Sequence, residues 1–155
     1  MSTVESVQLT REGWEQLHKE LVLCKKARDS RLAGLMNVAR EAEPGGAVVR
    51  HEQQEIDSAD RRIAYLEDIL SRAIPISAAD RTLGVIGVGS RVTVSWEGGE
   101  EESYLIVGPP EVDLATNRIS YESPVGRALM ERSEGEWVEV KTPGGMSRLE
   151  IAKVI

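Results

Sequence analysis

The residues with the clearest chemical potential lie in a sharp turn between two long helical patterns. Residues 39–54 read Ala-Arg-Glu-Ala-Glu-Pro-Gly-Gly-Ala-Val-Val-Arg-His-Glu-Gln-Gln, and the carboxylates nearest the turn are Glu41 and Glu43. Carboxylate oxygens are ligands that hard cations such as Mg²⁺ prefer in proteins. On a helix, residues two apart point about 200° away from one another, so joint chelation requires that residues 42–45 leave the helix.

Other kinds of chemistry have little support in the sequence. The only histidines, His18 and His51, are far apart in the chain, and the single cysteine, Cys24, excludes an internal disulfide framework. No Cys/His cluster offers a zinc site. We therefore expect no resident cofactor and no metal bound by this chain alone.

The charge of the chain favours a protein partner over nucleic acid. It carries 26 acidic and 19 basic residues, which give a net charge of −7. This charge disfavours non-specific electrostatic binding to the phosphates of nucleic acid. No stretch approaches the roughly 18 apolar residues needed to span a bilayer, and the N-terminus does not resemble a signal peptide. We expect a soluble, cytoplasmic monomer that does not bind membranes.

The first half of the chain has helical periodicity. Thr10 is a plausible N-cap, and after it apolar residues recur at alternating steps of three and four. A second helix follows the Pro44-Gly45-Gly46 break and has the cleaner heptad pattern. Such helices can bury their seams only against each other, which predicts an antiparallel coiled-coil hairpin over residues 1–76 with its tip near 41–47. The expected seams are Trp14, Leu17, Leu21, Cys24, Leu32, Leu35 and Val38, facing Val49, Glu52, Ile56, Ala59, Ile63, Leu66 and Leu70.

The second half of the chain has the alternating pattern of apolar and polar residues that is typical of β-strands. Pro75 ends the helix, residues 74–80 are expected to form a linker, and strands are predicted at 91–96, 103–107, 137–141 and 147–154. A short helix between the hairpins begins with Ser123 as N-cap and Pro124 at its first position. The prediction is an α+β domain over residues 77–155, with a small antiparallel sheet and one short helix.

Several motifs resemble, in order, those of the Gre family of bacterial transcript cleavage factors. The N-terminal half matches in Leu9-Thr10-Arg11-Glu12-Gly13, in Ala39-Arg40-Glu41 and in Glu52-Gln53-Gln54. The C-terminal half matches in Ile106-Val107-Gly108, in residues 119–129 (Ile-Ser-Tyr-Glu-Ser-Pro-Val-Gly-Arg-Ala-Leu) and in Thr142-Pro143-Gly144-Gly145. The resemblance therefore covers nearly the whole chain.

The resemblance implies a fold, a partner and a set of site residues. It implies an FKBP-like C-terminal domain that docks at the rim of the RNA polymerase secondary channel, with Asp113, Ser120, Ser123 and Pro124 as docking residues. It implies a coiled coil that reaches through the channel, where acidic tip residues help to hold the second catalytic Mg²⁺. Glu41 and Glu43 would then share that ion, close to the nascent RNA. With some thirty residues in its first helix, the rod is about 45 Å long and has the reach for this.

The tip departs from the family motif Gly-Asp-Leu-x-Glu-Asn-x-Glu-Tyr. That motif places a Glu three residues after an Asp, whereas Glu41 and Glu43 are two residues apart in a shorter segment. We therefore expect an inhibitor that obstructs the polymerase channel, modulating the polymerase without being an enzyme itself. The alternative is a genuine cleavage factor that uses Glu41 and Glu43.

Two remoter functions share the implied architecture. A peptidyl-prolyl isomerase needs an aromatic-lined pocket, yet the chain contains no Phe. A nucleoside diphosphate kinase regulator is disfavoured by the long first helix. The basic residues Lys25, Lys26, Arg28 and Arg31 could face RNA, but a solvated helix face with Lys25 paired to Asp29 is the favoured interpretation.

Overall fold

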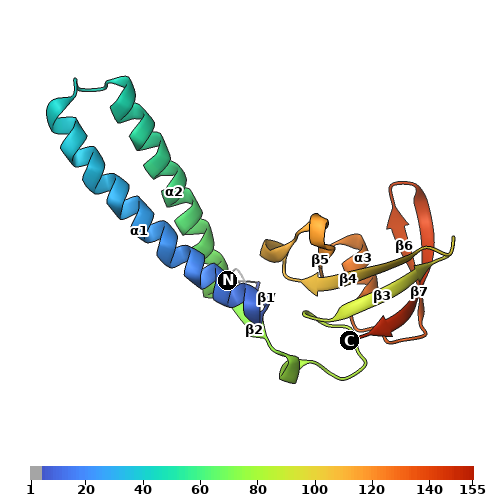
Figure 1. Ribbon diagram of the computed structural model, residues 1–155. Coiled ribbons are helices and arrows are strands. Elements are labelled where there is room, and N and C mark those ends of the chain that lie inside the picture. Colours follow the sequence, from blue (N-terminus) through green and yellow to red (C-terminus); the bar gives the residue numbers. More distant parts are fainter. Residues whose placement is uncertain (1–4) are drawn as a thin grey trace. The chain divides into compact units, whose positions relative to one another are not determined.

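The computed structural model describes residues 5–155 and divides the chain into two compact units (Figure 1). One unit, residues 14–72, is a helical hairpin. The other combines the segment that ends at Gly13 with residues 73–155 and contains all the strands. The predicted α+β class is confirmed.

The hairpin consists of α1 (Arg11–Glu41) and α2 (Ala47–Arg72). Thr10 caps α1 as predicted, because its Oγ1 accepts a hydrogen bond from the backbone N–H of Gly13 at 3.0 Å. Burial follows most of the predicted seams, but the prediction is wrong for Leu32, which is exposed, and it missed Ile69, which is buried. Arg28, half-buried, takes a seam position on α1. The buried side chains of the hairpin are Leu17, Ile56, Ile63, Leu66 and Ile69, of which Leu66 is fully buried.

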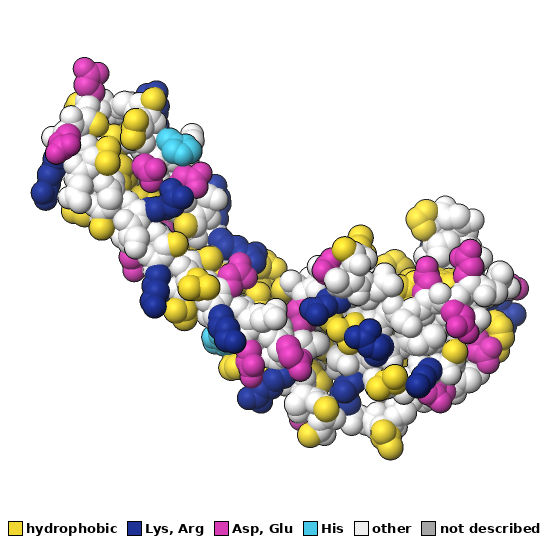
Figure 2. Space-filling view, in the orientation of Figure 1, with side chains coloured by type: hydrophobic (Ala, Val, Ile, Leu, Met, Phe, Trp, Pro, Cys, Tyr) yellow, Lys and Arg dark blue, Asp and Glu magenta, His cyan; other side chains and the backbone are white. Residues whose placement is uncertain are grey.

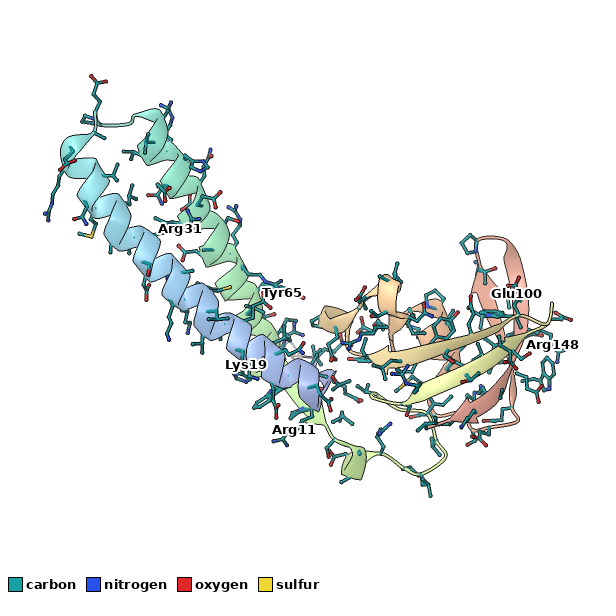
Figure 3. All side chains as sticks on the ribbon, viewed as in Figure 1. Arg11, Lys19, Arg31, Tyr65, Glu100 and Arg148 are labelled. Carbon is teal, nitrogen blue, oxygen red and sulfur yellow. The ribbon has the colours of Figure 1, made fainter. Side chains whose placement is uncertain are left out.

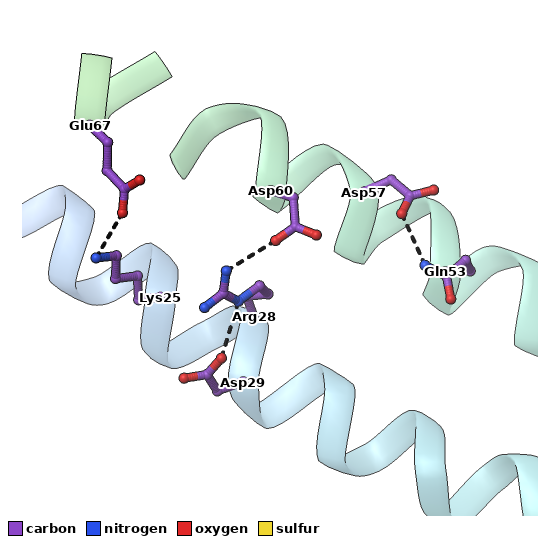
Figure 4. Close-up of polar contacts among 7 residues, drawn as sticks. All are labelled: Lys25, Arg28, Asp29, Gln53, Asp57, Asp60 and Glu67. Atoms are coloured by element: carbon purple, nitrogen blue, oxygen red, sulfur yellow. Dashed lines mark hydrogen bonds and ion pairs between the residues drawn. The ribbon is translucent and has the colours of Figure 1, made fainter. Parts of the chain in front are cut away.

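Ion pairs join the two helices beside this narrow seam (Figure 4). Arg28 contacts Asp60 at 3.2 Å, and Lys25 contacts Glu67 at 2.8 Å. The expected pairing of Lys25 with Asp29 is wrong, because Lys25 reaches across to α2 and Asp29 instead accepts from Arg28. Charged side chains of both signs lie along the hairpin surface (Figure 2). Exposed pairs contribute little stability, so their main effect is to favour this helix pairing and register over others.

A short parallel sheet connects the two ends of the hairpin. β1 (Val7–Thr10) leads directly into α1, and β2 (Ala73–Ile76) directly follows α2. The strands pair in register from Val7 opposite Ala73 to Thr10 opposite Ile76. The residues expected to be a linker therefore include a strand, followed by the short helix η1 (Ala78–Asp80). This pairing also moves the unit boundaries away from residue 76, since the first strand belongs with the C-terminal unit.

The main sheet has five strands in the order β5-β4-β3-β7-β6. Its neighbouring pairs are antiparallel except β4 with β5, which are parallel, so the expectation of a purely antiparallel sheet is corrected. The parallel pair arises because the chain makes a long connection, through two short helices, between these strands. The elements are β3 (Arg91–Trp96), β4 (Glu101–Val107), η2 (Pro109–Glu111), η3 (Leu114–Thr116), β5 (Arg118–Ser120), α3 (Pro124–Leu129), β6 (Trp137–Thr142) and β7 (Gly145–Val154).

The core of this unit lies on one face of the sheet. Alternate residues of β3, Val92 and Val94, are fully buried, as period-two patterning requires. α3 packs on β5 and β6 and buries Leu129 completely. The core is completed by Ile86, Ile106, Ile119, Val138, Val140, Leu149 and Ile151.

The thin seam of the hairpin predicts a strong response to truncation of Leu66. This side chain is 0% exposed, so Leu66→Ala is expected to lower the free energy of unfolding by about 2–5 kcal/mol, through lost burial and a cavity. Leu23→Ala is the control, because Leu23 is 65% exposed and its loss should change stability by less than about 0.5 kcal/mol. Denaturant unfolding followed by circular dichroism measures both. Equal effects of the two variants would contradict the assigned seam.

Candidate functional site

The turn at the end of the hairpin places Glu41 and Glu43 in different backbone environments. Glu41 is the last residue of α1, whereas residues 42–46 are not helical. Gly45 has a φ of 76°, which favours glycine, and the N–H of Gly46 donates to the carbonyl of Glu43 at 3.0 Å. Arg50 fastens the turn from α2 by donating to the carbonyl of Gly45 at 2.7 Å. The 200° separation of helical residues therefore does not apply to this pair.

Both tip carboxylates are exposed, and neither is neutralised by a neighbouring cation. Within residues 5–155, no ion pair reaches Glu41 or Glu43. The same residues contain no group of three or more side chains of His, Cys, Asp or Glu that could hold a metal ion. Two carboxylates supply only part of the six-ligand shell of Mg²⁺, so this turn can contribute to an ion held elsewhere but does not form a complete site.

An exposed apolar residue adjoins the carboxylates. Val48, in the first turn of α2, is 61% exposed, while Val49 is half-buried. Burying Val48 against another surface would be favourable, since the hydrophobic effect contributes about 25 cal/mol per Å². The turn thus combines negative charge with an apolar contact surface.

Ser120 and Ser123 form a hydrogen-bonded corner between β5 and α3. The hydroxyl of Ser123 donates to the carbonyl of Ser120 at 2.7 Å and accepts from the N–H of Gly126 at 3.0 Å. The hydroxyl of Ser120 accepts from the N–H of Glu122 at 3.0 Å, and Ser120 is buried. Both serines are therefore committed to local structure, whereas Pro124 and Glu122 are exposed at this corner.

Asp113 lies in the same unit, at the other end of β5. It caps η3 by accepting from the N–H of Ala115 at 3.1 Å, and its backbone pairs with that of Arg118. The next residue, Leu114, is 78% exposed. Leu114 was not among the residues singled out from the sequence, although a leucine in a polar loop was a usable signal. The structure thus places the expected docking residues at the two ends of β5, in the sheet unit. The tip carboxylates lie in the unit formed by the helical hairpin.

Comparison with known proteins identifies the family. A family model described as "Transcription elongation factor, GreA/GreB, C-term" matches residues 81–155. The transcription elongation factor GreA of Thermosipho africanus is 38% identical over 152 residues, which cover 95% of each chain. The chain belongs to the GreA/GreB family. The GreA of Nautilia profundicola is 35% identical to this family member over 149 residues, or 94% of this chain and 92% of that one.

Solved structures with similarity to this GreA/GreB family member include Gfh1 (GreA factor homolog 1) of Thermus thermophilus. That chain is 28% identical, with a TM-score of 0.47, and the match covers 97% of this chain and 99% of that chain. Among residues 5–155, no helix of this family member combines the length and the apolar character that crossing a bilayer would require.

The corner between β5 and α3, formed by residues 120–124 and called the Ser-Pro corner, predicts that Gly126 cannot be replaced. A Cβ at Gly126 would lie 2.0 Å from the carbonyl oxygen of Ser120, a backbone atom that cannot move aside cheaply. Gly126→Ala is therefore expected to destabilise the sheet unit by about 2 kcal/mol or more. Gly98→Ala is the control, because nothing lies within 4 Å of its Cβ position. Thermal unfolding compares the two, and equal melting temperatures would show that the corner is not closely packed.

Proposed function

We propose that this chain binds RNA polymerase at the rim of the secondary channel, inserts its hairpin toward the active site and inhibits transcription without stimulating RNA cleavage. The observation that carries the proposal is the turn between α1 and α2. Among the described residues, it presents two exposed carboxylates but too few ligands to hold a metal ion alone. Membership of the GreA/GreB family supports RNA polymerase as the partner.

The hairpin has suitable dimensions and stability for such a role. Its α1 has 31 residues, and at about 1.5 Å per residue this gives a rod on the order of 45 Å long. The two helices bury their apolar seams against each other, so the hairpin needs no further layer to cover them. A rod of this kind can enter a channel and exclude nucleotides from it.

The tip itself favours obstruction over catalysis. Its two carboxylates are separated by one residue, unlike the Asp and Glu three apart in the cleavage-factor motif. Exposed Val48 adds an apolar contact that does not contribute a metal ligand. Negative charge next to the catalytic Mg²⁺ would still perturb the ion, which adds to steric blocking.

One observation favours the alternative, a genuine cleavage factor. Glu43 has left the helix, so its side chain is not held on the opposite side from that of Glu41. Both carboxylates could then approach one Mg²⁺ and help to activate a water molecule for hydrolysis of the transcript.

Backtracked transcription complexes distinguish the two functions. Inhibition predicts slower RNA synthesis and no release of short 3′ RNA fragments when the chain is added to stalled, backtracked polymerase. Release of such fragments at a rate that depends on the chain would establish the cleavage factor instead.

The tip charges are expected to contribute to inhibition. A Glu41→Gln, Glu43→Gln variant keeps the shape of the turn but removes both charges, so the concentration required for half-maximal inhibition should rise about tenfold. Asp57→Asn is the control, because Asp57 is an exposed carboxylate on α2 whose hydrogen bond from Gln53 an asparagine can keep. Elongation assays measure both, and unchanged inhibition by the double variant would show that blocking is purely steric.

The Ser-Pro corner is the proposed docking element, and Pro124 is its most direct probe. Ser123 is a poor choice for substitution, because its hydroxyl caps α3. Pro124→Glu places a bulky charge at an exposed first-turn position, where an acidic residue is compatible with the helix dipole. Polymerase binding should weaken about tenfold or more with the fold intact.

Ala152→Glu is the matched control, since it introduces the same charge at an exposed position of β7. Binding to core polymerase and thermal unfolding are measured for both variants. Equal binding by Pro124→Glu and wild type would remove this corner from the docking surface.

A further inference from the structure

The exposed side chain of Glu102 lies on the same face of the main sheet as the core, near the turn that joins β3 and β4. Tyr104 lies opposite Val92 and Glu102 lies opposite Val94 in the β3–β4 pairing, and both valines are fully buried. Side chains directly opposite each other share a face, so Glu102 and Tyr104 share the face of the core. Trp96, two residues after Val94, lies on this face as well and, like Tyr104, is half-buried.

Glu102 is held by both aromatic side chains through one oxygen. The indole Nε1 of Trp96 donates to Oε2 of Glu102 at 3.0 Å, and the hydroxyl of Tyr104 donates to the same atom. Burial and the neighbouring carboxylate raise the pKa of Tyr104 to about 12, so the phenol remains a donor at physiological pH. No donor among residues 5–155 bonds to Oε1, so this oxygen keeps its lone pairs for another donor.

No cation within the described part of the chain neutralises this group. In residues 5–155, no ion pair reaches Glu102 or its neighbours Glu97, Glu100 and Glu101. Figure 3 labels Glu100 at the end of the β3–β4 hairpin. Residues 77–155 contain 13 acidic and 8 basic residues, so this half has a net charge of −5. Such a surface is complementary to a basic partner.

Protection of a sheet edge explains only part of this charge. β5 pairs with β4 only at Leu105–Val107, so β4 has no strand partner on that side from Glu101 to Tyr104. Charged residues on such an edge deter pairing with other chains. That role suits Glu101, whose side chain points away from the core face, but it does not require the two aromatic donors that orient Glu102.

We propose that Trp96, Glu102 and Tyr104 form a receptor for an arginine side chain of RNA polymerase. This inference rests on the docking proposed above and names the chemistry of one contact in it. The guanidinium donates to the free Oε1 of Glu102 and lies against the aromatic rings, which suits arginine better than lysine because its planar group both stacks and donates. The two donors on Oε2 fix the carboxylate in advance, so little side-chain entropy is lost on binding.

The test is binding of the full chain to the cognate core polymerase. Glu102→Gln removes the charge but keeps a carbonyl oxygen that can accept from Trp96 and Tyr104. Its affinity should fall about tenfold, and the dependence of affinity on salt concentration should become weaker. Tyr104→Phe removes one of the two anchors and should cause a smaller loss.

Glu101→Gln is the matched control, because it removes the same charge from the same strand on the opposite face. Its affinity should stay near that of the wild type. An affinity of Glu102→Gln equal to that of the wild type would overturn the receptor. Equal losses of affinity in Glu102→Gln and Glu101→Gln would also overturn it, because they would indicate diffuse attraction to the acidic residues of the β3–β4 hairpin. If the wild-type chain does not bind polymerase, the docking proposal itself fails.

Folding of the variant is checked independently of polymerase. Thermal unfolding of Glu102→Gln should match wild type within a few degrees, and absorbance titration should show the pKa of Tyr104 falling from about 12 toward its ordinary value. Because burial also raises this pKa, the expected fall is partial, and an unchanged tyrosine titration would show that the charge of Glu102 does not act on Tyr104, which would contradict the arrangement of the receptor.

Discussion

The parallel pairing of β1 with β2 is the constraint on which the rest of the structure depends. These strands lie immediately before α1 and immediately after α2, so their hydrogen bonds hold the two ends of the hairpin next to each other. Two helices with a thin apolar seam and mostly exposed ion pairs gain much from such closure at the base. Without it, the turn at residues 42–46 would be the only closure at an end of the hairpin, beside the seam and the ion pairs along its length.

Glu111 ties this base to the main sheet. Its carboxylate accepts hydrogen bonds from the N–H groups of Thr10 and Gly108, each at 3.0 Å, and from the hydroxyl of Thr10. Glycine is required at position 108, because a Cβ there would lie 2.2 Å from the backbone carbonyl oxygen of Gln8. A Cβ at Gly13 would lie 1.9 Å from Oε1 of Glu111 and would displace this carboxylate from its position. The cap of α1, the strand β1 and the sheet unit therefore form one connected set of contacts.

Local patterns in the sequence predicted the hairpin, strands β3, β4, β6 and β7 and the start of α3, because each has its own periodicity or capping signal. The pairing of β1 with β2 and of β4 with β5 could not be predicted in this way, since these short strands are defined by partners distant in the chain.

At the candidate site, sequence identified Glu41 and Glu43 but not the backbone of the turn. It identified Ser120 and Ser123, but not that local hydrogen bonds occupy their hydroxyls. The contacts of Glu102 required the cross-strand register.

The central claim is that the sheet unit docks on RNA polymerase while the turn at residues 42–46 reaches the active-site channel. A photoreactive amino acid at Pro44, an exposed residue of that turn, tests this directly. The account predicts crosslinks to polymerase segments that surround the catalytic Mg²⁺, and their loss when Pro124→Glu is added to the same chain. Crosslinks confined to the outer surface of the polymerase, or crosslinks to the catalytic segments that persist in the Pro124→Glu chain, would contradict it.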